Sequence, residues 1–388
     1  MRSALEKYFP EIELGIASIG TQPRETFHAG NATYFNIVRK SNSHKSGLAK
    51  VISNWRHYQY DWSEVNSYSN VIKEFKPDLI VSYGTENPFV LAFGQFETPS
   101  LVILQGSIQQ ISKHYFNALS PIEFSQLLAS KDIIRGIGPI HRWLYLRGYI
   151  KFEHLFYQYC KNFSGRTEWD KKLVLKFQPE AHYFHCDEVL NPIFYGSFWD
   201  PNKSRENIIY TTCSDAIFKG ALTIVRALAY LKQQGRSDIK LHLGGVNLSS
   251  DIGRFIFNII NKHDLNEQVQ ALGVLNQAQI IEQINQARIF VLPSHIENSP
   301  NSLCEAMLIG APCIASNAGG TASMIQHAKE GLVYEPKDYR ELAMHISTLM
   351  DDPELAQNYG HQARITAMER HNPQRVAGEM VKIYKALL

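Results

Sequence analysis

Long apolar runs are missing from this chain. No stretch approaches the ~18 consecutive apolar residues that a membrane-crossing helix needs, which excludes an integral membrane protein. The opening residues, MRSALEKYFPEIELG, carry charges where a signal peptide would need its apolar segment. We therefore expect no secretion by that route and a cytoplasmic protein.

An excess of charge of one sign is also missing. The 39 Lys and Arg nearly balance the 37 Asp and Glu, for a formal charge of +2. Proteins that bind nucleic acid as their main function need a basic surface, so this balance argues against that class and we expect no nucleic-acid partner.

The cysteines lack any pairing pattern. Five of them are scattered along the chain without a CxxC motif, at positions 160, 186, 213, 304 and 313. An odd, dispersed set suggests neither a disulfide framework nor a zinc site, and is typical of a reducing compartment.

What is present is an alternating α/β pattern. The length of 388 residues predicts two domains of about 190 residues each. Short runs rich in β-branched residues alternate with helical stretches, which predicts parallel sheets covered by helices on both faces. These runs are 79–81, 101–104, 207–210, 239–243, 289–292 and 312–315.

The alternation is interrupted at residues 187–204, where prolines, a glycine and polar residues intervene. We place the domain boundary here, with an N-terminal domain at 1–190 and a C-terminal domain at 191–372. Residues 373–388 carry a helical apolar stripe, which predicts a final helix packing back on the N-terminal domain.

The segment 291–320 holds the strongest candidate site. A strand leads through Pro293 and Ser294 into a polar loop, and Ser299 is expected to cap a helix that Pro300 opens. Glu297 precedes this helix and Glu305 lies inside it, eight positions further on. The first-turn amides of Asn301, Ser302 and Leu303 would form an anion site at the sheet edge where α/β folds bind ligands.

This segment, with the Gly-Ala-Pro and Gly-Gly that follow, resembles the E-x7-E signature of retaining nucleotide-sugar glycosyltransferases, glycosyltransferase family 4 (glycosyl transferases group 1). The resemblance extends through Phe218-Lys219-Gly220, Leu243-Gly244-Gly245 and Leu272-Gly273-Val274. It covers 205–388 and, more loosely, the N-terminal half. It implies the α/β GT-B fold, in which two doubly wound Rossmann-like domains face each other across a cleft.

The resemblance also implies roles for individual residues. Glu297 would bind hydroxyls of a donor hexose and stabilise charge as the glycosidic bond breaks, and Glu305 would accept from the ribose. Lys219 and the amides of 301–303 would stabilise the departing diphosphate, where negative charge develops. The remaining donor-binding positions implied are Gly244 and Gly245 beside the nucleotide and Leu272 and Val274 beside the base.

No metal or cofactor is expected. The large glycosyltransferase class that uses a divalent ion holds it with Asp-x-Asp, and this chain contains no such motif. Lys219 and a helix N-terminus would replace the ion. The nucleotide-sugar, UDP- or GDP-linked, would be a substrate.

The chain departs from the family at three places. Ser214 stands where the family usually has an arginine, and Arg166 is a candidate replacement, the alternative being an ordinary surface arginine. Gln105-Gly106 replaces a His-Gly, and glutamine forms hydrogen bonds but does not titrate. The chain opens with a predicted helix at 3–9 and a strand at 12–19, so the first strand of the N-terminal domain and its glycine-rich loop are expected to be missing.

Residues 113–161 combine seven Lys and Arg and three acids with many aromatic residues. This stretch predicts either peripheral contact with an anionic membrane or, alternatively, a domain core with a solvated basic face.

The sequence therefore predicts a hexosyltransferase that retains anomeric configuration and acts on a saccharide or lipid-linked acceptor, in surface polysaccharide synthesis at the inner face of the membrane. The alternatives are a non-catalytic nucleotide-sugar-binding or scaffold protein and a nucleotide-sugar epimerase, which the E-x7-E pattern disfavours.

Overall fold

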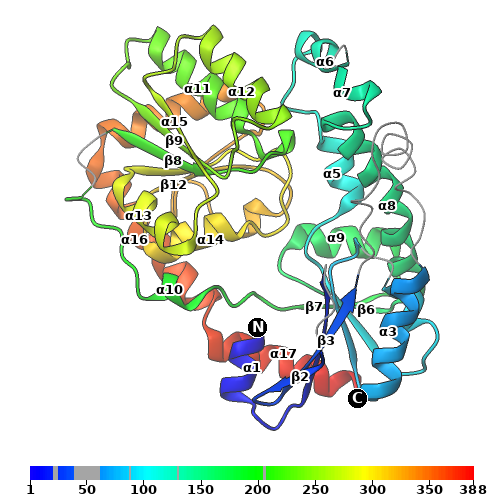
Figure 1. The fold of residues 1–388 in the computed structure, drawn as a ribbon. Helices are drawn as coiled ribbons and strands as arrows, with labels where there is room; N and C mark the ends of the chain where they lie inside the picture. The colour runs from blue at the N-terminus through cyan, green and yellow to red at the C-terminus, as the bar shows by residue number, and fades with distance from the viewer. Residues whose placement is uncertain (21–24, 39–61, 87–88, 129–130, 204–206) are drawn as a thin grey trace.

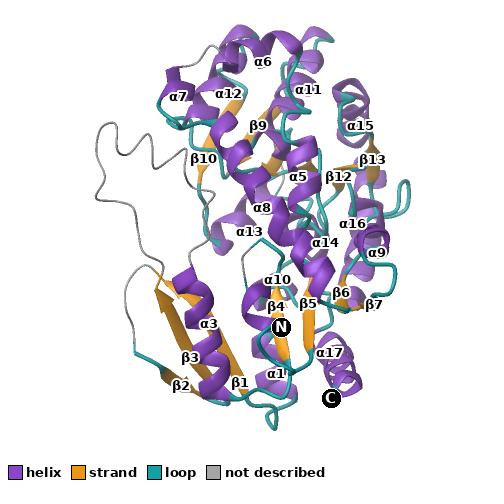
Figure 2. Cartoon of the chain, turned by 90° about the vertical axis from the view of Figure 1, so that its right-hand side faces the viewer, coloured by secondary structure: helices purple, strands orange, loops and turns teal. Residues whose placement is uncertain are grey.

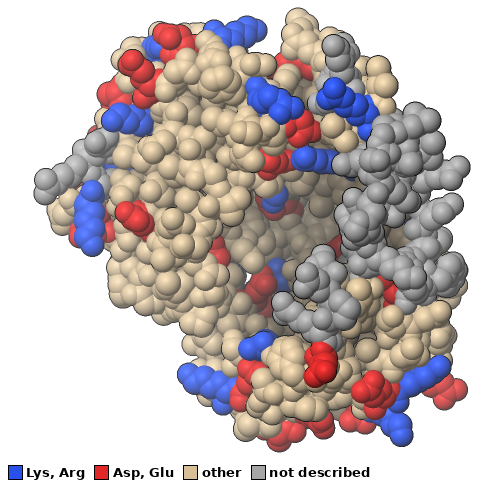
Figure 3. Space-filling view, in the orientation of Figure 1, with Lys and Arg blue, Asp and Glu red and all other residues tan. Residues whose placement is uncertain are grey.

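The computed structural model describes residues 1–20, 25–38, 62–86, 89–128, 131–203 and 207–388. Two lobes face each other in Figure 1, and the space-filling view shows a deep hollow between them that side chains of both charges line (Figure 3). No helix in these ranges is long and apolar enough to span a membrane.

The C-terminal lobe is built on one sheet of six parallel strands in the order β10-β9-β8-β11-β12-β13. The chain winds outward from β8 in one direction and then from β11 in the other, so the strand order reverses between these two neighbours. This is the doubly wound arrangement, with a crevice at the reversal point. The strands are β8 (Ile208–Thr212), β9 (Lys240–Gly244), β10 (Val269–Gly273), β11 (Ile289–Leu292), β12 (Cys313–Ser316) and β13 (Leu332–Tyr334).

Helices cover both faces of this sheet because successive residues of each strand point to opposite sides. Ile209 and Val291 pack on one face and Tyr210 and Phe290 on the other, and all four are buried. The first face is covered by α11 (Ala221–Gln233), α12 (Asp251–Lys262) and α15 (Tyr339–Asp351). The second is covered by α10 (Pro192–Tyr195), α13 (Gln277–Gln286), α14 (Asn301–Ile309) and α16 (Pro353–Arg370).

The strands of the N-terminal half form two sheets rather than one. A three-stranded sheet has the order β1-β3-β2, and a parallel four-stranded sheet has the order β4-β5-β6-β7. In the described part of the chain, β1 and β4 are edge strands and no strand joins them; Figure 2 shows the two sheets standing apart. The strands are β1 (Leu14–Gly20), β2 (Phe27–Ala29), β3 (Ala32–Val38), β4 (Ile80–Tyr83), β5 (Ser100–Ile103), β6 (Asn162–Gly165) and β7 (His182–His185).

The aromatic residues of 113–161 are mostly buried or half-buried, with Tyr159 exposed. Phe156 and Tyr157 pack in the core with Val102 of β5 and Phe163 of β6, and Phe152 is buried as well. The helices of this half are α1 (Arg2–Tyr8), α3 (Trp62–Phe75), α4 (Val90–Phe93), α5 (Ile108–His114), α6 (Pro121–Leu128), α7 (Lys131–Ile134), α8 (Pro139–Tyr159) and α9 (Glu168–Phe177).

The last helix, α17 (Pro373–Leu387), leaves the C-terminal lobe and packs on the N-terminal half (Figure 1). Val376, Met380 and Ile383 are buried against Leu101 and Ile103 of β5. The neighbouring face of the helix packs on α1. The chain therefore crosses between the lobes twice.

A second contact joins the lobes on the other side of the hollow. Arg226 of α11 donates to the Ala118 carbonyl (2.6 Å) and to Glu123 (2.5 Å). Arg142 of α8 donates to the Asp215 carbonyl (2.8 Å) and pairs with Asp251 at 3.2 Å. We call these two arginines and their partners the interlobe clasp.

All five cysteines are unpaired and buried. Burial raises the pKa of the Cys160 thiol to about 11 and that of Cys186 to about 12. Burial likewise raises the pKa of Cys304 to about 12. These thiols are packing residues.

Candidate functional site

Lys219 and Glu297 lie at the reversal point of the C-terminal sheet. Lys219 ends a short 3₁₀ turn, η1 (Ile217–Lys219), that follows β8, and Glu297 lies in the loop that follows β11. Because β8 and β11 are parallel neighbours, both loops emerge at the same edge of the sheet. The topology thus brings together two residues 78 positions apart in the sequence.

The two side chains contact each other directly. Lys219 Nζ lies 2.7 Å from Glu297 Oε1, and the Ser294 hydroxyl donates to the same oxygen at 2.7 Å. The Lys219 side chain is 31% exposed and that of Glu297 only 11%. The ammonium group of Lys219 and the carboxylate of Glu297 therefore compensate each other, and part of the lysine side chain remains exposed to solvent.

Glycine places the lysine turn close to the glutamate loop. Gly220 has a φ of +79°, a left-handed conformation that glycine adopts without a steric penalty. A Cβ atom there would collide with the Pro293 carbonyl oxygen. Gly220 is thus required for close approach of the two loops.

The Gly-Gly pair after β12 fixes the Glu297 loop in the same way. The Gly320 amide donates to the Glu297 carbonyl at 3.0 Å, and Gly319 has a φ of +59°. A Cβ on Gly319 would collide with that carbonyl, and one on Gly320 with the Asn298 carbonyl. From the N-terminal lobe, the Thr167 hydroxyl donates to Asn298 Oδ1 at 3.0 Å, so both lobes contact this loop.

His295 belongs to the same loop, although the sequence analysis passed over it. The side chain is only 4% exposed, and its Nε2 shares a 2.8 Å hydrogen bond with the Thr223 hydroxyl. Burial, assisted by Lys337 and Arg226, lowers its pKa to about 4, so the ring is neutral near pH 7. Its position between Ser294 and Glu297 was the one sequence signal.

The start of α14 differs from the expected capped helix. Ser299 does not cap it; its hydroxyl lies 3.6 Å from the Met324 sulfur, and Pro300 is the N-cap residue. The Leu303 amide bonds the Pro300 carbonyl at 3.1 Å, and its side chain is in the core. Among the residues described, this leaves the amides of Asn301 and Ser302 as the candidates for anion binding.

Glu305 lies one turn further along α14 and is half-buried. Burial raises the pKa of its carboxyl group to about 7, and the negative charge of Glu188 adds to the effect. This carboxyl group therefore changes charge near neutral pH.

The other predicted donor-side positions serve partly structural purposes. The space beside Gly245, which has a φ of +80°, is filled by the Cys213 carbonyl, and that beside Gly244 by the Tyr210 hydroxyl. Leu272 packs against the core, whereas Val274 is 87% exposed. The two glycines are thus required by the packing of β8 against β9.

The N-terminal lobe presents Gln105 and Gly106 at the end of β5. Gln105 is exposed and Gly106 half-buried. The amides that begin α5 next to them are engaged, since the Gln109 amide donates to Glu153 at 2.8 Å. Burial raises the pKa of Glu153 despite these hydrogen bonds.

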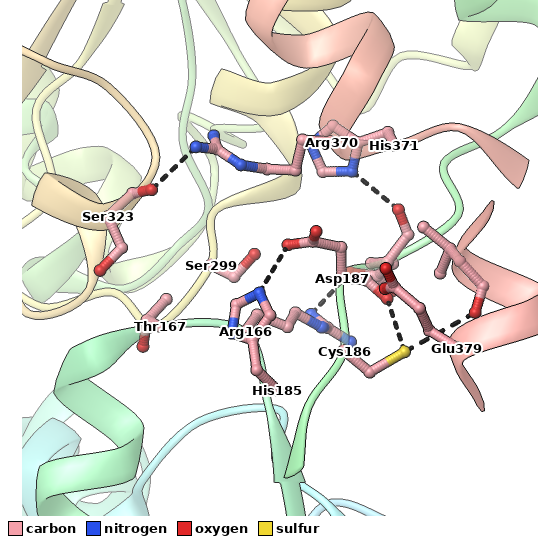
Figure 4. A network of polar contacts seen from close by, with 12 residues as sticks. Arg166, Thr167, His185, Cys186, Asp187, Ser299, Ser323, Arg370, His371 and Glu379 are labelled. Carbon is pink, nitrogen blue, oxygen red and sulfur yellow. Dashed lines mark hydrogen bonds and ion pairs between the residues drawn. The ribbon is translucent and has the colours of Figure 1, made fainter. Parts of the chain in front are cut away.

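Arg166 follows β6 and is not the surface arginine considered as an alternative. It is 6% exposed and pairs with Glu188 at 2.6 Å (Figure 4). The Glu188 carbonyl shares a 2.7 Å hydrogen bond with His371, and Arg370 donates to the Ser323 carbonyl at 3.0 Å. Arg166 is therefore built into the polar network at the chain crossing.

The same polar network attaches α17 to the segment between β7 and α10. Asp187 pairs with Arg375 at 2.8 Å and with His185 at 3.3 Å. The Asp187 hydrogen bond raises the pKa of His185, and the two partners lower that of Asp187. In the part of the chain that the structure covers, no group of three or more His, Cys, Asp or Glu side chains is placed to hold a metal ion.

This arrangement of two α/β lobes around a hollow, with a Lys–Glu pair at the reversal point of the second sheet, defines the GT-B class of folds, as predicted. A sucrose-phosphate synthase from Thermosynechococcus elongatus has a similar structure, with a TM-score of 0.71 at 17% identity over 96% of this chain and 88% of that one. Anabaena HepE in complex with UDP-glucose gives a TM-score of 0.67 at 15% identity, over 97% and 100% of the two chains.

Residues 198–366 match the model of the family glycosyl transferases group 1. An N-acetyl-alpha-D-glucosaminyl L-malate synthase of Bacillus anthracis is 29% identical over 56% of this chain and 54% of its own length. A glycogen synthase of Mycobacterium tuberculosis is 26% identical over 43% and 40%. The chain thus spans about half the length of the curated relatives it matches.

Proposed function

We propose that the protein is a retaining, metal-independent glycosyltransferase that moves a hexose from a UDP- or GDP-linked donor to a saccharide or lipid-linked acceptor. The observation that carries this is the contact of Lys219 with Glu297 at the edge of the sheet where α/β folds bind ligands. A capsular polysaccharide biosynthesis glycosyltransferase of Staphylococcus aureus is among the relatives, at 22% identity, which supports a role in surface polysaccharide synthesis.

The mechanism starts from the Lys219–Glu297 pair. When the donor enters, its diphosphate competes for Lys219, and Glu297 is released to accept hydrogen bonds from the sugar hydroxyls. The amides of Asn301 and Ser302 add two donors toward the phosphates. Because charge accumulates on the diphosphate as it leaves, these fixed positive groups stabilise the transition state more than the ground state.

The transfer itself breaks the bond between the anomeric carbon and the diphosphate oxygen. The acceptor hydroxyl attacks the same face of the sugar, and its proton passes to the departing phosphate oxygen. No side chain is needed as a base in this step, which is compatible with a glutamine at position 105.

Acceptor-dependent release of the nucleotide tests this proposal. Lys219→Ala should lower kcat by about 10²–10³, the usual effect of losing one transition-state donor. Lys232→Ala is the matched control, because this lysine pairs with Asp264 at the far end of α11. Activity should persist in a chelator. Full activity of Lys219→Ala would contradict the mechanism.

Nucleotide binding separates this function from the alternative of a non-catalytic binding or scaffold protein. UDP, GDP and ADP are compared by thermal denaturation of the wild type and of Glu305→Ala. A nucleotide at ~100 times its Kd adds about 2.7 kcal/mol of stability. A shift that Glu305→Ala abolishes, together with turnover, supports the transferase. A shift without turnover in the presence of acceptors favours the binding protein.

A further inference from the structure

A groove lies on the outer side of the interlobe clasp, where α6 and the start of α8 face α12. Both ribbon views place α6 and α12 near the same end of the molecule (Figures 1 and 2). The cavity has a volume of about 590 Å³, which is within the range of small-molecule sites. Its apolar lining comes from both lobes: Ile122, Leu127, Ile137, Ile140, Phe255 and Ile259.

Apolar side chains also project from the rim of this groove into solvent. Ile122 on α6 is 71% exposed, and Ile134 on the neighbouring α7 is 79% exposed. Leu128 and Ile137 are exposed as well. Large aliphatic side chains that gather on one exposed end, beside an apolar cavity, mark a surface that contacts another apolar phase.

The charges at the groove favour an anionic occupant. Its two acids, Glu123 and Asp251, are already paired with Arg226 and Arg142 of the clasp. Its two cations, Arg254 and Lys262 of α12, have no ion-pair partner among the residues that the structure covers. Lys and Arg side chains are seen on this part of the surface in Figure 3. Among the described side chains, the groove therefore has two cations without an acidic partner next to an aliphatic lining, although Arg254 donates to the Ser249 carbonyl at 2.6 Å.

We propose that this groove binds an anionic lipid of the membrane surface. The hydrocarbon chain lies between α6, α8 and α12, and the phosphate headgroup lies beside Arg254 and Lys262. The exposed isoleucines enter the lipid layer. This refines the membrane contact predicted for 113–161 by adding α12 of the other lobe and by replacing the buried aromatic residues with Ile122 and Ile134. The biological role of this lipid binding rests on the proposed function, whereas the binding itself does not.

Vesicle co-sedimentation of the full chain tests whether the positive charge of Arg254 and Lys262 is needed for lipid binding. The protein should bind vesicles of phosphatidylglycerol and phosphatidylcholine and not those of phosphatidylcholine alone. Arg254→Gln with Lys262→Gln should weaken binding about fivefold per cation removed. Lys382→Gln, an exposed lysine on α17, is the matched control. Equal binding to both vesicles, no binding to either, or an equal effect of the control would overturn the proposal.

The contribution of the exposed isoleucines to vesicle binding is tested with separate variants. Ile122→Asn with Ile134→Asn should abolish binding while the melting temperature is unchanged, because both side chains are exposed. Ile365→Asn, another exposed isoleucine, on α16, should have no effect. To place the lipid in the groove, Ile137→Trp is compared with the wild type in vesicles whose chains are brominated. Extra quenching is expected, and its absence would overturn the groove assignment.

These measurements read binding rather than transfer, so their failure is distinct from failure of the proposed reaction. The nucleotide-induced melting shift should be the same in the groove variants as in the wild type. Only variants that melt at the wild-type temperature without ligand are compared, so that a loss of lipid binding does not arise from a disturbed fold.

Discussion

At the scale of single residues, the carboxyl group of Glu305 couples the candidate site to pH. Burial disfavours its charged form, which raises its pKa from an ordinary value of 4.5 to about 7. Between these two values the folded state binds a proton that the unfolded state has lost. The contribution of this group to stability is therefore greatest below pH 4.5 and falls as the pH rises through 7.

We expect this titration to cost about 3 kcal/mol of folding free energy between pH 4.5 and 7. Glu305→Gln should flatten that part of the stability profile, as measured by urea unfolding at a series of pH values. Glu267→Gln, an exposed carboxyl, should leave the profile unchanged. A Glu305→Gln profile parallel to that of the wild type would show that the group titrates normally.

Gly319 allows a second residue-level prediction, because Gly30 offers a control with nearly the same backbone. Their φ values are +59° and +63°, so alanine at either position costs about 1–2 kcal/mol of backbone strain. Only at Gly319 would the new Cβ also collide with the Glu297 carbonyl; nothing lies within 4 Å at Gly30. Gly319→Ala should therefore lose more stability than Gly30→Ala and also most transfer activity, as measured by unfolding and nucleotide release.

At the scale of elements, α17 makes the stability of the N-terminal half depend on the C-terminus. Met380 is buried against β5, so Met380→Ala should cost about 2–5 kcal/mol through lost contacts and a cavity. Lys382→Ala, exposed on the same helix, should cost much less. The two are compared by denaturant unfolding with hydrogen exchange on β5. Equal losses would mean that the helix docks only weakly. Removing 373–388 altogether should lower the melting temperature of the N-terminal half.

The elements also show what sequence patterns can and cannot predict. The four inner strands β9, β8, β11 and β12 of the C-terminal sheet were predicted because buried strands read as short aliphatic runs, whereas the edge strands β10 and β13 were not. Lys219 and Glu297 were assigned to one site through the resemblance of their motifs to the family pattern, and in the structure the two side chains are in contact. The Ser299 cap was wrong because Pro300 takes that position and turns the serine toward Met324. The capping preference of serine is a local property of the sequence and takes no account of the tertiary contact between Ser299 and Met324.

Individual side-chain pairs between loops that are distant in the sequence could not be predicted. The pairing of Arg166 with Glu188, and the paired state of Lys219, depend on how loops from different strands meet. His295 was passed over because one histidine in a loop has no spacing pattern. Its hydrogen-bond partner Thr223 lies on α11, far away in the sequence, and its low pKa arises chiefly from burial.

At the scale of the whole molecule, the interlobe clasp limits how far the hollow can open. The crossing segments join the lobes on one side and the clasp joins them on the other. Glu123 is only 13% exposed and pairs with Arg226, so removing either partner leaves a partly buried charge.

We predict a coupling energy of about 1–3 kcal/mol between Arg226→Ala and Glu123→Ala in a double-mutant cycle. The single variants should also increase the radius of gyration measured by small-angle X-ray scattering. The pair Lys232→Ala and Asp264→Ala, on the surface of one lobe, should show coupling below 1 kcal/mol and no change in size. Additive effects at the clasp would mean that the lobes do not depend on it.

The buried cysteines have a consequence for how such motions can be followed. A thiol with a raised pKa inside a packed core is nearly inert to alkylating reagents until the surrounding structure opens. Cys160 belongs to the N-terminal core and Cys304 to the second face of the C-terminal sheet. The rate at which each one gains mass in iodoacetamide therefore times the local opening of its own lobe, in the unmodified protein and without an introduced probe.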